Sequence, residues 1–270
     1  MDLRRSIILG LFLTAVTFAR SPLEAQRTFH STQSANLQTT DALRGGNWLF
    51  EISHRFQPTV SDGGADQLWG LDGPIWNRLA LSYAPTDGVL MGIQRTNLED
   101  NLEVNAKAVL LEVGSDAVRV DLGLMGGVAW NMDPGPSSVD DNEMQAYGQL
   151  LVNALLGDRF ALGVVPTYLY NPRILDAEAD DGYAIGVHGQ AYLTGSMSLL
   201  GEWIFSEERP GMENDSGTFG IEFETRGHFF KLLVTNQVRM NPTQFLGGSP
   251  FPFEAEELRL GFNITRLLPF

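Results

Sequence analysis

The chain has 270 residues, with 18 Lys and Arg against 33 Asp and Glu, a formal net charge of −15 and no Cys. An acidic chain repels polyanions, so this balance argues against nucleic acid as a partner. The lack of Cys excludes disulfide scaffolds, Cys-ligated zinc, iron–sulfur clusters and thiol nucleophiles. With 19% charged residues and 29 Gly, the composition fits neither a helical soluble enzyme nor a disordered chain.

The first 25 residues have the features of a secretory signal peptide. Arg4 and Arg5 precede an apolar run over 7–19, and small residues lead to a predicted cleavage site after Ala25. The run is shorter than the roughly 20 apolar residues that a membrane-spanning helix needs. We therefore expect an exported, acidic mature protein.

From position 47 onward, apolar and polar residues alternate with a period of two, which is typical of β-strands. In the segment 47–56, Trp48, Phe50 and Ile52 alternate with Glu51 and Arg55, and His54 is the exception on the apolar side. The pattern predicts about twelve strands. They cover residues 47–56, 75–84, 88–95, 102–110, 117–130, 142–155, 160–170, 183–194, 197–205, 217–224, 229–238 and 257–265.

The connections between these segments alternate between short turns and long loops. Short turns are expected at 84–88, 114–116, 157–158, 195–196 and 225–227, and only 96–101 breaks the alternation. An outer-membrane barrel sorts its connections in this way, whereas a soluble β-sandwich shares the period but not the sorting. We therefore predict an all-β fold, a transmembrane antiparallel up-and-down β-barrel over 47–270.

If the apolar face of each strand meets lipid, the other face lines a lumen and carries the charges. The predicted lumen contains acidic and basic residues in similar numbers, together with one His. They are Glu51, Arg55, Arg78, Glu103, Lys107, Arg119, Asp121, Glu143, His188, Glu202, Glu222, Glu224, Lys231, Glu257 and Arg259.

Aromatic residues near the strand ends indicate the two membrane interfaces, where aromatic girdles gather. The candidates are Trp48, Trp76, Trp130, Tyr168 and Trp203. The last strand ends in Phe262, Ile264 and the terminal Phe270, which looks like the signal that the barrel-assembly machinery of bacterial outer membranes reads. Pro269 departs slightly from its usual form.

The segments 46–56, 68–73, 78–83 and 92–95 together resemble an uncharacterised bacterial family of membrane-bound β-barrel domains. The likeness covers most of the mature chain and is densest over 45–110. It implies the barrel fold and supplies no activity, substrate or cofactor.

Two polar segments leave their placement open. Residues 26–46 lack a clear period and are either a disordered periplasmic lead-in, which we favour, or a plug that enters the lumen. The Gly-rich loop 57–74 either folds inward as a constriction or stays exposed.

No catalytic or metal site is expected. None of the four His belongs to an HExxH motif or an i,i+4 pair, and no GxSxG, P-loop or dinucleotide motif occurs. One face of two neighbouring strands carries His188, Ser198 and Glu202, the residue types of a hydrolase triad. A polar network in the lumen explains the same residues and is the favoured interpretation. The segment 176–187 fails as an EF-hand because Val187 stands where Glu is required.

The sequence thus favours an outer-membrane barrel that passes or holds a small solute in a charged lumen. We expect no cofactor. The alternative is a non-conducting barrel that serves as a structural or docking element for a periplasmic or surface partner; a third, weaker one is an outer-membrane hydrolase. Expected partners are outer-membrane lipid, lipopolysaccharide and the barrel-assembly machinery. Lipopolysaccharide is included because divalent cations bound by the acidic loops would bridge them to its anionic groups.

Overall fold

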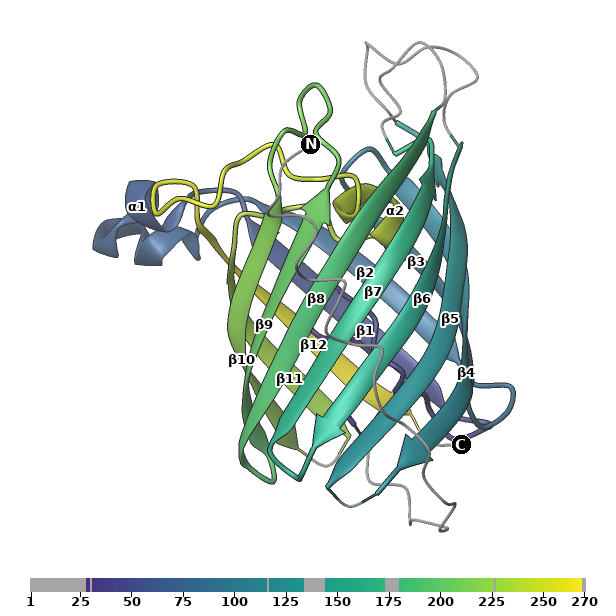
Figure 1. Ribbon diagram of the computed structural model, residues 1–270. Helices are drawn as coiled ribbons and strands as arrows, with labels where there is room; N and C mark the ends of the chain where they lie inside the picture. Colours follow the sequence, from purple (N-terminus) through teal and green to yellow (C-terminus); the bar gives the residue numbers. More distant parts are fainter. Residues whose placement is uncertain are drawn as a thin grey trace, which may run out of the picture.

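The computed structural model describes residues 28–29, 31–115, 117–133, 144–172, 180–225 and 227–268. Within them, twelve antiparallel strands form a closed barrel in which each strand pairs with its sequence neighbours and the first pairs with the last (Figure 1). The strands are β1 (Trp48–Phe56), β2 (Ile75–Tyr83), β3 (Val89–Thr96), β4 (Asn101–Gly114), β5 (Val118–Asn131), β6 (Met144–Leu156), β7 (Phe160–Tyr170), β8 (Asp181–Thr194), β9 (Met197–Ser206), β10 (Ser216–Thr225), β11 (His228–Thr235) and β12 (Arg259–Leu268). The predicted fold class is confirmed.

The alternation of the sequence becomes the two faces of the wall. Large apolar side chains such as Leu79, Leu162 and Leu232 point outward and are about half exposed. The opposite positions are mostly buried and carry the charged and amide side chains of the wall together with apolar ones such as Val165 and Leu233. An apolar exterior over most of the wall is incompatible with a water-exposed monomer and fits a surface that lipid covers.

The connections sort to the two ends of the barrel. The turns that join β2 to β3, β4 to β5, β6 to β7, β8 to β9 and β10 to β11 are short and share one end, where the chain also finishes (Figure 1). The other end, called here the long-loop end, carries the longer connections. The one exception is the β3–β4 connection, which is short because Arg95 pairs with Asp100 across it and Glu99 and Asp100 adopt positive φ.

Three short helical elements interrupt the loops. α1 (Val60–Gly63) and the 3-10 helix η2 (Ala65–Gly70) lie in the β1–β2 connection, residues 57–74, which we call the lateral loop. It stands outside the barrel (Figure 1). Of the two placements expected for it, an inward constriction and an exposed loop, the structure therefore has the exposed loop. α2 (Pro242–Phe245) belongs to the β11–β12 connection and lies inside the mouth (Figure 1). No helix among these described ranges is long and apolar enough to cross a membrane.

The predicted strand 229–238 is too long at its end. β11 stops at Thr235, and the next residues turn inward and are buried. The turn is fixed by Asn236, whose side chain accepts a hydrogen bond from the Gly217 N–H at 2.8 Å and donates to the Phe251 carbonyl at 2.7 Å. Residues 236–249, called here the inward loop, are therefore part of the barrel interior.

Two strand glycines test the packing of the wall. A Cβ at Gly220 in β10 would lie 2.4 Å from the Leu232 carbonyl oxygen, whereas a Cβ at Gly148 in β6 would meet nothing within 4 Å. We expect Gly220→Ala to lower stability by about 1–3 kcal/mol, the usual cost of overpacking. The measurement is the temperature at which the folded barrel converts to its unfolded gel mobility. Gly148→Ala is the control, and an equal loss in both variants would contradict the packing at β10.

Candidate functional site

The interior of the barrel combines buried charged and amide side chains with several buried apolar clusters. Glu51, Arg55, Arg78, Glu103, Lys107, Asp121, His188, Glu202, Glu222, Lys231 and Arg259 are all buried inside the wall. A buried charge is costly unless it is paired and hydrogen-bonded. The partners of these groups therefore define what the interior can do.

Many of those partners come from the segment before β1. Residues 28–29 and 31–46 run into the lumen and return, with an antiparallel bridge between Gln33 and Gln38 and a hydrogen bond from the Ser34 N–H to the Leu37 carbonyl at 2.7 Å. We call this segment the N-terminal hairpin. Its residues 28–29 and 31–40 are all buried except Gln38, which is half-buried. The sequence leaves two placements for 26–46, a disordered periplasmic lead-in, which it favours, and a plug in the lumen. The described part of the segment lies inside the lumen, as the plug alternative expects.

Two lysines of the wall hold the hairpin by its backbone. The Lys107 ammonium in β4 donates to the carbonyls of Thr32, Thr39 and Asp41 at 2.9, 2.9 and 2.7 Å. The Lys231 ammonium in β11 donates to the carbonyls of Gln33 and Ser34, both at 2.6 Å. Each cation thus replaces its hydration shell with peptide oxygens, as charge-assisted hydrogen bonds allow.

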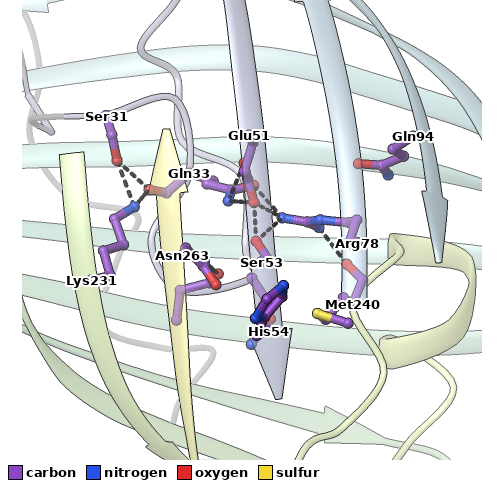
Figure 2. A network of polar contacts seen from close by, with 12 residues as sticks. Ser31, Gln33, Glu51, Ser53, His54, Arg78, Gln94, Lys231, Met240 and Asn263 are labelled. Carbon is purple, nitrogen blue, oxygen red and sulfur yellow. Dashed lines mark hydrogen bonds and ion pairs between the residues drawn. The ribbon is translucent and has the colours of Figure 1, made fainter. Parts of the chain in front are cut away.

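Lys231 also forms an ion pair with Glu222 at 3.2 Å, and the Ser31 hydroxyl donates to Glu222 at 3.2 Å. The Lys231 ammonium donates to the Ser31 hydroxyl at 2.7 Å (Figure 2).

Buried carboxylates of the wall accept hydrogen bonds from the same hairpin. Glu202 in β9 accepts from the backbone N–H groups of Asn36 and Leu37 at 2.9 and 3.1 Å. Glu51 in β1 accepts from both the Gln33 amide, at 2.8 Å, and the Arg78 guanidinium, which also reaches the Met240 carbonyl (Figure 2).

Asp121 in β5 accepts from the Thr28 hydroxyl and from Arg119, whose Nε lies 2.8 Å away.

Four apolar residues of the hairpin fit separate apolar patches of the lumen wall. Phe29 packs with Leu155 and Ala161 and stacks on His188 at a ring distance of 4.8 Å. The other three pack in the same way: Ala35 with Leu200 and Leu233, Leu37 with Leu151, Val165 and Ile204, and Leu43 with Leu49, Ala84 and Leu90. The cavity left between the hairpin and β1, β11 and β12 is only about 20 Å³, room for about one water molecule.

The inward loop fills the opposite half of the lumen. Glu103 accepts from the backbone N–H and the hydroxyl of Thr243 at 3.1 and 3.0 Å, and the Asn241 amide donates to Asn101 at 2.6 Å. Phe245 and Leu246 share one buried cluster with Leu37 of the hairpin. The two inserted segments therefore meet inside the barrel.

The remaining predicted lumen residues lie at the edges. Arg259 is buried at the start of β12 with its guanidinium carbon 3.8 Å from the centre of the Phe251 ring, and Glu257 lies before β12 in the loop. Glu224 is half-buried near the short-turn end of β10. Glu143 and the terminal Phe270 lie outside the described residues, as does the predicted signal peptide.

Four predicted interface aromatics, Trp48, Trp130, Tyr168 and Trp203, face outward near strand ends. Trp76 differs: it lies two residues before the buried Arg78 in β2, so strand alternation directs it to the lumen side. Phe262 and Ile264 alternate with the buried Asn263 and also lie on the outer side, where His54 packs on Phe262 at 4.5 Å.

The residues weighed for a hydrolase are engaged elsewhere. Ser198 accepts from the Gln190 amide at 2.5 Å, Glu202 binds the hairpin, and the His188 ring lies against Phe29 with Nε2 at 3.3 Å from the Asn153 amide nitrogen. The described contacts do not join Ser198 to His188. Across the part of the chain that the structure describes, no group of three or more His, Asp or Glu side chains is arranged to hold a metal.

Sequence reasoning missed the neutral partners in this network. Gln33, Asn36, Asn153 and Asn263 are buried and bridge the hairpin to the wall, for example through the Asn263 amide, which donates to the Ala35 carbonyl at 2.7 Å. The available signal was weak: four apolar residues spaced through an otherwise polar segment that precedes the first strand.

The chain belongs to the family described as a membrane bound beta barrel domain, DUF5777, whose model matches residues 29–268. The matched range includes the hairpin as well as the strands. No curated protein matches the sequence.

Among solved structures, the COG4313 outer membrane channel from Pseudomonas putida F1 is similar over 85% of this chain and 98% of its own, with 13% identity and a TM-score of 0.52. The KdgM porin gives 9% identity and a TM-score of 0.48 over 82% and 99% of the two chains. Outer membrane phospholipase A from Escherichia coli gives 11% identity and 0.41 over 83% and 90%. At these identities the likeness concerns the fold.

Lys107 provides a test of how the hairpin is held. Lys107→Met leaves three buried carbonyl oxygens without their donor, at a cost of about 1–3 kcal/mol. In a chain that carries Ala35→Cys, which places a thiol at a fully buried site of the hairpin, we expect this change to raise the rate of labelling by a water-soluble maleimide about tenfold.

Arg159→Met is the matched control, because it removes one positive charge from an exposed turn. Equal labelling rates in the two variants would contradict a hairpin held by Lys107.

Proposed function

We propose that this protein is an outer-membrane channel for a small polar solute, closed by its own N-terminal hairpin. The observation that carries the proposal is the binding of the Lys107 and Lys231 ammonium groups by hairpin carbonyls. The lumen is lined by charges, some of which pair within the wall, but the hairpin supplies all three hydrogen-bond partners of Lys107 and most of those of Lys231.

The hairpin can leave without breaking the barrel. It contributes no strand to the closed sheet, and its bonds to the wall include those to side chains of β1, β4, β5, β6, β9, β11 and β12. Removing it costs hydrogen bonds and small apolar contacts, which water and a polar solute can replace in part. A strand of the wall has no such freedom, because its loss would open two sheet edges.

The lumen that the hairpin occupies offers both signs of charge. Glu51, Glu202 and Asp121 present carboxylates to the hairpin, and Lys107 and Lys231 present ammonium groups. A balanced lining of this kind suits a neutral or zwitterionic polar solute better than a strongly charged one. It also explains why a chain segment rich in amides and hydroxyls fits there.

The outer-membrane location is supported by the sorted connections, because bacterial outer-membrane barrels combine short periplasmic turns with longer loops at the cell surface. The short-turn end would then face the periplasm, and the hairpin enters from that end: the Gly45 N–H donates to Asp87 in the β2–β3 turn at 2.7 Å. Lipopolysaccharide and the assembly machinery remain the proposed partners.

A second candidate, a non-conducting barrel, is favoured by the inward loop. Asn241 and Thr243 bond to β4 and Leu246 to Ser206 of β9 at 3.0 Å, so this loop spans the mouth and is joined to the wall at both of its ends. If it never moves, the barrel stays shut and serves as a docking element.

Current through single barrels in a planar bilayer tests the proposal. We expect the wild-type protein to conduct rarely and Lys107→Met to increase the open probability about tenfold, in line with the about 1–3 kcal/mol lost from the closed state. Arg159→Met should behave as the wild type.

A locked variant guards against leaks from misfolded protein. The chain has no Cys of its own, and Ala35 shares a buried cluster with Leu200 of β9, so Ala35→Cys with Leu200→Cys allows a disulfide between hairpin and wall. Conductance should vanish on oxidation and return on reduction. Folded barrels that stay silent in every variant would instead establish the non-conducting barrel.

A further inference from the structure

The lateral loop is a compact unit outside the barrel, not a slack connection. Its two ends are joined by a hydrogen bond from the Gln57 N–H to the Pro74 carbonyl at 2.9 Å. Inside it, a Cβ at Gly63 would lie 2.4 Å from the Gly70 nitrogen, and a Cβ at Gly73 would lie 2.3 Å from the Pro58 ring. Only glycine permits these close approaches, so the loop has one specific packing.

The lateral loop is fixed at the level of the outer wall by a neighbouring segment. The Val60 N–H donates to the Leu258 carbonyl at 2.8 Å, and the Ser61 hydroxyl donates to the Glu256 carbonyl at 3.2 Å. In the same segment, Phe253 packs on Trp203 of β9 and Phe219 of β10, with ring distances of 5.1 and 5.8 Å.

Trp203 and Phe219 belong to the outward face near the long-loop end. α1 accordingly stands beside the barrel in Figure 1, projecting from the wall near the upper ends of β9 and β10.

The lateral loop turns its large apolar side chains away from the protein. Leu68, Trp69 and Leu71 are 54%, 51% and 45% exposed. Leu68 and Trp69 adopt φ of 49° and 55°, in the left-handed region that costs such residues of order 1 kcal/mol each. An exposed, strained apolar cluster on a tightly packed loop indicates a surface that something covers.

We propose that the lateral loop is an interfacial anchor that inserts Leu68, Trp69 and Leu71 into the lipid leaflet at the long-loop end. Its surface continues the lipid-facing wall through Phe253, Trp203 and Phe219, so the bilayer reaches its base. Trp prefers the boundary between headgroups and acyl chains. The carboxylates of Asp62, Asp66 and Asp72 in the same loop keep it at that boundary, because a charge in the hydrocarbon is costly.

This anchor is independent of whether the barrel conducts. It requires a membrane at the wall, which the family provides, and the position of the loop beside that wall. A second copy of the chain is the other occupant that could cover the cluster, and the experiment separates the two.

Depth measurement by spin labelling tests the anchor in the intact protein, which is free of Cys. Single labels are placed at Leu71→Cys in the lateral loop, at Leu232→Cys on the lipid face of β11 and at Glu213→Cys in the exposed β9–β10 connection. Leu68→Cys is a second reporter in case the first disturbs the loop. The protein is reconstituted in phosphatidylcholine vesicles, and collisions with oxygen and with a water-soluble nickel chelate are compared.

We expect the ratio of oxygen to nickel collisions at Leu71→Cys to shift away from that at Glu213→Cys and to lie between the two controls. A ratio equal to that at Glu213→Cys would overturn the anchor. Shielding that persists in detergent together with dipolar broadening between labels of two chains would show that a second copy covers the cluster, which also overturns it.

Discussion

A closed barrel that buries charges on its inner face must find a partner for each of them, and the rest of the structure follows from this requirement. Lys107 has three hydrogen-bond partners, and all three are peptide carbonyls of the N-terminal hairpin. Glu103 accepts two hydrogen bonds from Thr243 of the inward loop, in addition to those from wall side chains such as Gln94 and Tyr147. The two inserted segments therefore supply polar partners to the buried charges of the wall, in addition to the apolar residues that they bury against it.

The strands and the sorting of their connections could be predicted from sequence because a period of two leaves a clear trace when one face meets lipid and the other does not. The contents of the lumen could not be predicted in this way. The alternation shows that Glu51 and Glu222 face inward, but not whether water, solute or chain lies opposite. Residues 28–29 and 31–46 have no period of two because their side chains meet several strands, for example β5 at Thr28, β1 at Gln33 and β6 at Thr40.

The end of β11 shows the same limit at a smaller scale. Val234 and Val238 continue an apolar pattern, so the sequence favours a longer strand. The strand ends early because Asn236 and Gln237 form more hydrogen bonds by turning inward than the ladder would offer, including the Gln237 amide to the Ser216 hydroxyl at 2.6 Å. Competition between side-chain and ladder hydrogen bonds depends on neighbours distant in the sequence, so local patterns do not reveal it.

The two closures differ in how they are attached, and this difference separates a gate from a wall. The inward loop is continuous with β11 and β12, whereas the hairpin contributes no strand and is held by separate contacts with individual strands. A force or a competing ligand on the hairpin can act on these contacts a few at a time. The inward loop is thus held by the chain at both of its ends, whereas the described part of the hairpin joins the wall through the chain only at β1.

The tip of the hairpin also lies across the seam where the circle of strands closes. Its residues bond to β1 through Gln33 with Glu51 and Asn36 with Arg55, and to the other side of the seam through the Ala35 carbonyl with Asn263 of β12. The two sides are more than two hundred positions apart along the chain, as the separation of 208 between Arg55 of β1 and Asn263 of β12 shows. These bonds can all form only after β12 has paired with β1, so the hairpin stabilises the closed circle of strands. The hairpin therefore stabilises the closure of the barrel on folding as well as filling part of its lumen.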